Sequence, residues 1–505
     1  MTTFLHALRA EAIKFISLRS SRVASLATVA VVIGVAYGVT ALTHQAMLSG
    51  DVTAAGGLES QPAFLVVLHY GQIGAVFLGA SVFAQERDNG VVASSLLAVP
   101  DRRSFFLAKA LSALAFGVAV ALPAVLGSYA ARCAVLDCRA VGSLTSLPGG
   151  DLRLLAGYII YWSLISLLSF LISSAFRSGI VGLTAMLALT LAISPYLLEF
   201  TSAARFLPDQ AGAQLLLQDA PLAGDLGPML GLLVLLSWIG VFAVTGFLSV
   251  RSWAVNHAEK GGGFMIEVEN LTKIYGKRTA IESVTFEARA GRVTGLLGPN
   301  GAGKSTTMRI LLGLDRATSG RASVLGSEYR SLRRPLTRVG AQFDGSGAHR
   351  GRTARAHLRW MATSNGISPT RIPETLRLVG LSDVADRRVG TFSLGMGQRL
   401  GIAAALLGDP EVVILDEPMN GLDPEGIRWI RDLARSLAGS GRTVLISSHL
   451  MGEMQSMADD LVVMARGTVI RAGAATSLVA EHDSLEHAYF AWTQGRAEHV
   501  AGDAA

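Results

Sequence analysis

Long apolar runs constrain this chain more than any other feature, because about 20 apolar residues in a helix are enough to cross the hydrocarbon core of a bilayer. Six such runs precede residue 252, and they lie near 22–43, 62–84, 105–130, 153–175, 179–198 and 226–250. The composition agrees, since 50% of the 505 residues are hydrophobic and 16% are charged. Residues 1–264 hold only 15 Lys/Arg and 13 Asp/Glu, whereas residues 265–505 have the charge density of an ordinary globular domain. A purely cytosolic enzyme is therefore disfavoured.

The positions of Lys and Arg favour six spans with both chain ends in the cytoplasm, because positively charged loops tend to stay inside. With the amino terminus inside, eleven Lys/Arg lie in cytoplasmic segments and four in external ones. A five-span alternative remains open, because Arg177 leaves only a tight turn between the fourth and fifth runs. That alternative would place the two chain ends on opposite sides. We expect an all-α, six-helix, multi-pass domain at 22–251 in the cytoplasmic (inner) cell membrane.

Residues 1–22 are predicted to form an amphipathic helix on the inner membrane face. Apolar residues from Phe4 to Ile16 recur at helical spacing, with charged residues between them. A cleaved signal peptide is the alternative interpretation. Glu11, the late apolar core and the absence of a clear cleavage site disfavour it.

Two groups of side chains in the apolar half have more than one interpretation. His69, Tyr70 and Gln72 lie inside the second run, where they either touch a substrate or form a hydrogen bond between helices. Cys133 and Cys138 fall in a loop predicted to be external, where they are either joined by oxidation or two separate thiols. With two cysteines in all, a disulfide-rich scaffold and a four-cysteine zinc site are excluded.

The sequence changes character after residues 252–264, which end in three glycines and are predicted to be a flexible linker. From Met265, short Val/Ile/Leu-rich runs alternate with helical patterns, which predicts an α/β domain over 265–495 and a flexible tail at 496–505. Met265 also has the character of a natural start of a separate polypeptide. The chain is therefore either one natural protein or a fusion of two subunits.

A phosphate-binding loop is predicted between a likely strand at 293–297 and a helical run at 304–314. Its glycines let backbone N–H groups close around phosphate oxygens, and the helix amino terminus adds positive potential. Lys304 is expected to reach the β and γ phosphates of ATP, and the Ser305 hydroxyl to bind Mg²⁺. The nucleotide-binding residues expected in this loop are Gly298, Pro299, Asn300, Gly301, Ala302, Gly303, Lys304, Ser305 and Thr306.

A second motif, Val412-Val-Ile-Leu-Asp416-Glu417, is an apolar strand that ends in two acids. A buried strand would place Asp416 beside the metal and let Glu417 act as general base on the attacking water. Strand-end acids often cap helices, so this motif alone is weak. More than a hundred residues after a phosphate loop, it strongly indicates an α/β P-loop NTPase.

These motifs resemble the ATP-binding cassette (ABC) family, and the resemblance extends from Tyr275 to His449. It implies that Tyr275 stacks on adenine and that Gln342, between two lobes, contacts the nucleotide and its metal. It also implies that His449 acts in catalysis by sensing the γ-phosphate. Asn420-Gly-Leu-Asp423 resembles the D-loop, which implies a nucleotide contact for Asp423.

The residues Phe392-Ser393-Leu394-Gly395-Met396 occupy the place of the family's Leu-Ser-Gly-Gly-Gln signature, after a segment 345–390 that resembles its helical subdomain. Ser393 and Gly395 are kept and are implied to contact nucleotide, but the glutamine is missing, which puts the contacts to a partner's nucleotide in doubt. The variant is similar to cassettes that serve type-2 ABC permeases. Six spans and the loop 86–103 are typical of such permeases.

The resemblance implies half of a transporter, which works as a homodimer with ATP and Mg²⁺ as cofactors. Each site would combine Lys304 and Glu417 of one copy with Ser393 and Gly395 of the other, and the 85–104 loop would pass motion to the spans through the region after Gln342. The expected function is ATP-driven export of an amphiphile, such as a drug, a peptide antibiotic or a lipid-like molecule, in contact with membrane lipid. The alternative is an ATP-gated membrane regulator or sensor.

A soluble cassette that acts on ribosomes or DNA is excluded, because it would need two cassettes in tandem and no spans. The net charge of +6 comes with no basic tract, which argues against a nucleic-acid partner.

Overall fold

The computed structural model describes residues 2–49, 63–86, 91–136, 149–176, 178–216, 226–251, 265–343, 345–480 and 482–493. The chain forms two compact units. The cassette unit is Met1–Ser17, Glu86–Phe105 and Arg251–Ala505, and the helical unit is Leu18–Gln85 and Phe106–Val250. The predicted linker 252–264 and the tail 496–505 lie outside the described residues.

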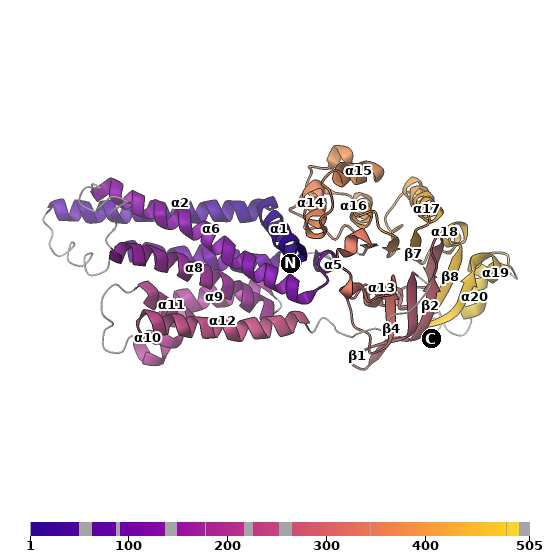
Figure 1. The fold of residues 1–505 in the computed structure, drawn as a ribbon, viewed down its shortest axis with the longest axis horizontal. Helices are drawn as coiled ribbons and strands as arrows, with labels where there is room; N and C mark the ends of the chain where they lie inside the picture. Colours follow the sequence, from indigo (N-terminus) through magenta and orange to yellow (C-terminus); the bar gives the residue numbers. More distant parts are fainter. Residues whose placement is uncertain are drawn as a thin grey trace, which may run out of the picture. The chain divides into compact units, whose positions relative to one another are not determined.

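The helical unit is built from apolar helices (Figure 1). They are α2 (Arg19–Ser49), α4 (Ala63–Ala84), α6 (Arg102–Leu136), α8 (Gly149–Ala175), α9 (Gly179–Ala188), α10 (Ser194–Phe200), α11 (Pro208–Ala213) and α12 (Gly227–Arg251), with a π turn η1 (Leu189–Ile193) and 3-10 turns η2 (Ser202–Phe206) and η3 (Gln214–Leu216). The π turn lies just before Pro195, which has no N–H for the helical ladder.

Five helices in the described part of the chain are long and apolar enough to cross a membrane, not the six predicted. They are Arg19–Ala46, Arg102–Val135, Leu152–Ala175, Gly179–Phe200 and Gly227–Val250. The remaining predicted run, 62–84, folds as α4, but the structure describes side chains only from Gly71, and Gly71–Ala84 alone is too short. The fourth and fifth predicted runs are separate helices, since α8 ends at Ala175 and α9 begins at Gly179.

Small residues bring α4 and α8 into close contact. A Cβ added to Gly79 would lie 1.9 Å from the Ser166 carbonyl oxygen, so only glycine permits this approach. The Ser169 hydroxyl donates to the Val76 carbonyl at 2.8 Å. The buried Tyr161 hydroxyl donates to Gln72 Oε1 at 2.5 Å, so Gln72 makes an interhelical hydrogen bond. The side chains of His69 and Tyr70 lie outside the description.

Cys133 does not lie in a loop, which corrects the sequence prediction. Helix α6 continues to Leu136, beyond the predicted end of the third run at residue 130. Cys133 is therefore helical and buried in a hydrophobic cluster that includes Tyr129 and Leu154. The apolar run extends past residue 130 because this last part of α6 also packs in the core. Cys138 lies outside the described residues.

The cassette unit contains two sheets. The antiparallel one has the order β2-β1-β4, and the six-stranded one, parallel except for its last strand, has the order β5-β6-β7-β3-β8-β9. The strands are β1 (Ile266–Tyr275), β2 (Arg278–Ala288), β3 (Val293–Leu297), β4 (Ser319–Val324), β5 (Val339–Gln342), β6 (Val412–Leu415), β7 (Thr443–Ser448), β8 (Asp460–Ala465) and β9 (Thr468–Ala474).

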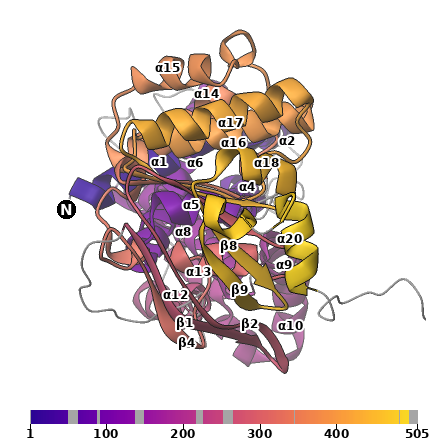
Figure 2. The same ribbon diagram turned by 90° about the vertical axis from the view of Figure 1, so that its right-hand side faces the viewer.

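The cassette helices are α13 (Lys304–Leu311), α14 (Ala354–Asn365), α15 (Arg371–Leu378), α16 (Leu394–Leu406), α17 (Pro424–Gly439), α18 (Met451–Met457), α19 (Ala475–Val479) and α20 (Leu485–Thr493). Helices α14, α15, α16 and α17 lie on the side of the cassette unit away from β1, β2 and β4, whereas α13 packs against these three strands (Figure 2). Short 3-10 turns are η4 (Tyr329–Ser331), η5 (Pro335–Thr337), η6 (Ser382–Val384) and η7 (Val389–Thr391). Together with the sheets, they confirm the predicted α/β P-loop NTPase architecture.

The strand order explains why distant motifs meet. The strand before the phosphate loop, β3, pairs with β7, and β7 pairs with β6, all in parallel. The carboxyl ends of parallel strands lie at the same edge of a sheet. The phosphate loop, Asp416 and the segment after Ser448 therefore converge at one edge.

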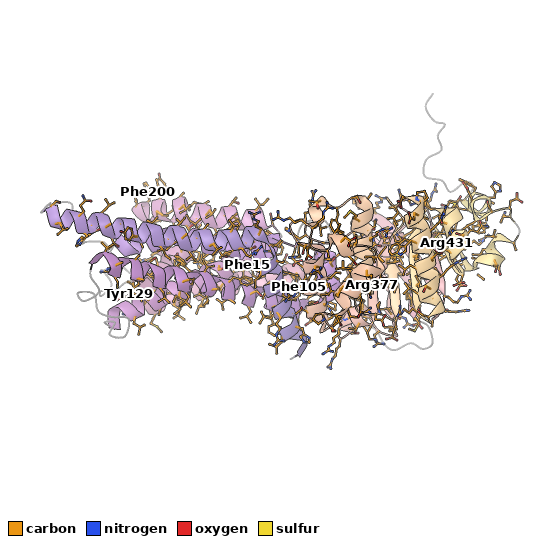
Figure 3. The ribbon with its side chains drawn as sticks, turned by 90° about the horizontal axis from the view of Figure 1, so that it is seen from above. Phe15, Phe105, Tyr129, Phe200, Arg377 and Arg431 are labelled. Carbon is orange, nitrogen blue, oxygen red and sulfur yellow. The ribbon has the colours of Figure 1, made fainter. Side chains whose placement is uncertain are left out.

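Two segments from the first half of the chain belong to the cassette unit. Helix α1 (Thr2–Ser17) packs against α14, and α5 (Val91–Ala98) contacts α14 and η5. Figure 3 labels Phe15 on α1 and Phe105 near the start of α6, both in this unit. The Lys14 ammonium binds Glu11 at 2.8 Å and Glu86 at 2.9 Å. A salt-bridged lysine that is 4% exposed holds the two segments together.

Candidate nucleotide-binding site

The phosphate loop joins a fully buried strand, β3, to helix α13. Gly303 caps this helix with φ of 101°, in the left-handed region that favours glycine. A Cβ at Gly303 would also lie 2.4 Å from Ile281 Cγ2. Only glycine therefore lets the loop turn tightly enough for backbone N–H groups to face a ligand.

A cavity of about 520 Å³ lies beside this loop. Predicted residues line much of it: Tyr275, Pro299, Asn300, Gly301, Ala302, Gly303, Lys304, Ser305, Thr306 and Glu417. Gly298 is not among the lining residues. Arg278, Thr279, Ala280 and Arg466 line the cavity as well. Sequence reasoning missed these four because no motif includes them. Arg278 pairs with Tyr275 across the turn between β1 and β2, and Arg466 lies in the turn between β8 and β9.

Lys304 and His449 both contact Glu417, and Lys304 and Glu417 line the cavity. The Lys304 ammonium lies 3.1 Å from Glu417 Oε1, and it also donates to the carbonyls of Gly298 at 2.6 Å and Pro299 at 3.2 Å. Glu417 Oε2 lies 2.9 Å from His449 Nδ1. Glu417 has φ of 48°, in a left-handed region that is costly for a residue with a Cβ. The structure thus brings the two predicted catalytic residues together with the phosphate-loop lysine.

Ser447 connects the two acids of the second motif, and sequence reasoning missed it. Its hydroxyl donates to Asp416 Oδ1 at 2.5 Å and accepts from the Glu417 backbone N–H at 2.8 Å. Ser447 is fully buried at the end of β7. The available signal was its place in Ser447-Ser-His449, directly before the predicted switch histidine.

Gln342 does not line the cavity in this structure. It ends β5, where its Nε2 donates to Gln398 Oε1 on α16 at 2.6 Å. The side chain is 2% exposed, and its Oε1 has no hydrogen-bond partner among the residues that the structure describes. Gln342 therefore joins the sheet to α16 and leaves a buried carbonyl oxygen for a further ligand.

The signature and D-loop residues also lie apart from the lining of the cavity. Ser393 is exposed and caps α16, and Gly395 follows in its first turn. Asp423 caps α17 by accepting from the Gly426 N–H at 2.8 Å. Leu394, which is 65% exposed, packs on Gly421, where an added Cβ would lie 2.2 Å from Leu394 Cδ2. The leucine at position 394 of the signature therefore has room beside the D-loop because residue 421 is glycine.

The described residues contain no group of three or more His, Cys, Asp or Glu side chains that could hold a metal by themselves. Ser305 lies at the cavity, and Asp416 directly follows β6, which β7 separates from β3. Mg²⁺ in phosphoryl-transfer sites commonly takes one or two protein ligands, with phosphates and water as the rest. The arrangement suits a metal that binds together with a nucleotide.

Two comparisons with known proteins agree with this geometry. The family model described as "ABC transporter" matches residues 281–420. The lantibiotic transport ATP-binding protein SrtF of Streptococcus pyogenes is 41% identical over 206 residues, which are 41% of this chain and 89% of that protein.

Two further relatives match a similar share of this chain. The bacitracin transport ATP-binding protein BcrA of Bacillus licheniformis is 41% identical over 209 residues, or 41% of this chain and 68% of that protein. The Nod factor export ATP-binding protein I of Neorhizobium galegae is 40% identical over 221 residues, or 42% of this chain and 63% of that protein. The chain belongs to the ABC transporter family, and its cassette is an ATPase coupled to transport.

Proposed function

We propose that this chain is half of an ATP-driven exporter, which works as a homodimer and moves an amphiphilic compound out across the cytoplasmic membrane. The observation that carries the proposal is the Lys304–Glu417–His449 cluster at a cavity, on a chain whose described residues also include five candidate spans. We assign residues 22–251 of this chain as a type-2 permease domain.

Each residue of the cluster has a distinct task in hydrolysis. Lys304 leaves the loop carbonyls and Glu417 to bind the β and γ phosphates of ATP, and the freed Glu417 carboxylate accepts a proton from the attacking water. His449, 2.9 Å from that carboxylate, fixes its orientation and donates a hydrogen bond toward the γ-phosphate. Tyr275, 47% exposed at the cavity, offers its ring to the adenine.

Mg²⁺ fits the oxygen atoms near the phosphate loop. The Ser305 hydroxyl and the Asp416 carboxylate would hold it. Gln342 Oε1, which has no hydrogen-bond partner within the described part of the chain, is a third oxygen that suits a hard cation or its water shell. When bound, the ion neutralises charge on the phosphates and so helps the leaving group to depart.

A second copy supplies the rest of the site. Ser393 and Gly395 are absent from the cavity lining but lie at the exposed amino terminus of α16. This terminus can contact the γ-phosphate on another copy, because helix amino termini bind anions. Asp423 and its D-loop lie beside the signature and would meet the partner at the same surface.

The path of the chain supports six spans with both ends in the cytoplasm. Lys14 binds Glu86 in the cassette unit, so the chain between them must leave and return to the same side. That interval contains α2 and α4. Helix α4 has 22 residues and is about 33 Å long, which is enough to cross the hydrocarbon core of a membrane. Counting α4 with the five candidate spans gives six, an even number, which returns the chain to the cassette.

The cytoplasmic segment 91–102 is the part that transmits cassette movement to the spans. The Tyr329 hydroxyl donates to the Leu97 carbonyl at 2.8 Å, and Asn365 Nδ2 donates to the Ala98 carbonyl at 3.0 Å. These contacts lie on η4 and at the end of α14. Closure of the cassettes on ATP would therefore move α5 and the start of α6.

The relatives support the choice of an amphiphilic cargo. They are ATP-binding proteins for lantibiotic transport, bacitracin transport and Nod factor export. Transport of bacitracin or a lantibiotic into inverted membrane vesicles, with ATPase stimulated by the same peptide, tests the proposal. Vesicles with Glu417→Gln should transport none. ATPase activity without uptake of either peptide or of any fluorescent amphiphile would instead favour an ATP-gated regulator.

A further inference from the structure

The end of the phosphate-loop helix contacts the first half of the chain. Helix α13 begins at Lys304 and ends at Leu311, and Gly313 follows with φ of 62°. The Gly313 carbonyl accepts from Arg330 Nε at 2.8 Å and from Arg102 Nη2 at 3.2 Å. Arg102, 7% exposed, is the first residue of α6. One backbone carbonyl therefore joins the nucleotide-binding helix to a membrane helix.

Two residues further on, Asp315 contacts Tyr275, which lines the nucleotide cavity. Its Oδ2 accepts from the Tyr275 hydroxyl at 3.1 Å and from Arg309 Nε at 2.8 Å. Burial and the neighbouring Asp315 charge raise the pKa of Tyr275 to about 12, so its hydroxyl stays protonated and donates. Tyr275 also lies under Lys273, whose ammonium is 4.7 Å from the ring centroid. Asp315 thus fixes the direction of a ring that lines the cavity.

The segment 313–315 is tied to α13 by its backbone. The N–H groups of Leu314 and Asp315 both donate to the Arg309 carbonyl, at 2.8 and 3.2 Å. An α-helix of eight residues is about 12 Å long and moves as a rigid rod. The charge of Asp315 also acts favourably on both Arg102 and Arg330. A shift of Asp315 therefore changes the surroundings of Arg102.

We propose that Asp315 is a positioning residue for Tyr275, and that through the segment 313–315 it couples nucleotide occupancy to Arg102 at the start of α6. The inference rests on the proposed function, because it takes Tyr275 as the adenine contact. Coupling between two sites is reciprocal. A change at Arg102 must therefore alter nucleotide affinity, although Arg102 does not line the cavity.

The first experiment is a double-mutant cycle on ADP affinity, measured by titration calorimetry on the full chain in lipid nanodiscs. Tyr275→Phe keeps the ring but loses the hydroxyl, and Asp315→Ala loses the acceptor. Each should weaken ADP binding about 5-fold, the scale of one hydrogen bond. Together they should also weaken it about 5-fold, and Asp315→Asn, which can still accept, should restore most of the affinity. The control Asp383→Asn, at an exposed carboxylate, should change nothing.

The second experiment compares two adjacent arginines. Arg102→Gln should weaken ADP binding about 3-fold, whereas Arg103→Gln, at an exposed neighbour, should leave it unchanged. In an Asp315→Ala background the Arg102 effect should disappear. Arg102→Lys keeps the charge and should bind ADP nearly as wild type does. This conservative variant is the control for misfolding caused by substitution at position 102.

Two results would overturn the inference. One is a loss of ADP affinity of about 25-fold in the double variant of Tyr275 and Asp315, which is the product of the two single effects. The other is an unchanged ADP affinity in Arg102→Gln. If the wild-type chain binds ADP and hydrolyses ATP, either result refutes only this coupling. A wild-type chain that binds no ADP would refute the proposed function itself.

Discussion

The ion pair between Lys304 and Glu417 makes a testable prediction about nucleotide affinity. Their charged atoms are 3.1 Å apart, and the side chains are 5% and 17% exposed. At an effective dielectric of about 20, the attraction is roughly 5 kcal/mol before desolvation is counted. The cost of removing two buried charges from water offsets most of this attraction. Lys304 must give up this interaction when it turns to a phosphate.

Glu417→Gln removes the charge and keeps the shape, so it should free Lys304 in the nucleotide-free protein. We expect ADP to bind about 10-fold more tightly, which corresponds to about 1.4 kcal/mol of the pair's net contribution. Hydrolysis of ATP should fall at least ~10²-fold, because the general base is lost. ADP titration of the full chain measures the first effect, and phosphate release measures the second.

Repeating the Glu417→Gln substitution in a protein without Lys304 distinguishes loss of the ion pair from loss of repulsion between Glu417 and the phosphates. In Lys304→Met protein no ammonium competes for Glu417, so Glu417→Gln should improve ADP affinity by less than 3-fold. An equal gain in both backgrounds would mean that repulsion alone is responsible and would refute the reasoning. Near-normal ATP turnover by Glu417→Gln would show that Glu417 is not the base.

Three further predictions follow from other parts of the cassette unit. Mixing Lys304→Ala chains with Ser393→Arg chains should restore some ATPase activity relative to either homodimer, because one intact shared site remains; a rate per chain that is independent of concentration and mixing would contradict sharing. Burial, with the nearby Arg352 and Lys14 charges, lowers the pKa of His357 to about 3. Between pH 6.5 and 3 the unfolded chain then binds more protons, so stability should fall by up to about 1.4 kcal/mol per pH unit as the pH falls, and His357→Gln should flatten this slope in thermal unfolding. Gly421→Ala should lower the free energy of unfolding by about 1–2 kcal/mol, since φ is 74° and the new methyl meets Leu394; Leu394→Ala should recover only the steric part.

The nucleotide half was predictable because its chemistry depends on local sequence patterns. A loop that binds phosphate needs glycines at fixed offsets, and Gly303 shows why, with its left-handed φ and no room for a Cβ. The buried strand before Asp416 is equally visible as four apolar residues. Both patterns arise within a few residues, so one sequence suffices to find them.

Contacts between residues far apart in sequence could not be predicted in the same way. Ser447 binds both Asp416 and Glu417 only because β7 lies between β3 and β6, an order that the sequence does not spell out. The sequence pattern predicts Lys14 on a helix at the membrane face but does not reveal its partner Glu86, which is 72 residues away. The membrane-interface position predicted for residues 1–22 stays a prediction, with Ile16, 62% exposed, on the face that would meet lipid.

The left-handed backbone at Glu417 sets stability against activity at a single position. A non-glycine residue with φ of 48° carries a conformational cost of about 1 kcal/mol that glycine would not. Glu417→Gly should therefore stabilise the cassette while it ends hydrolysis. A library screened only for heat resistance would accumulate glycine at this position, and only a screen that demands turnover would retain the carboxylate.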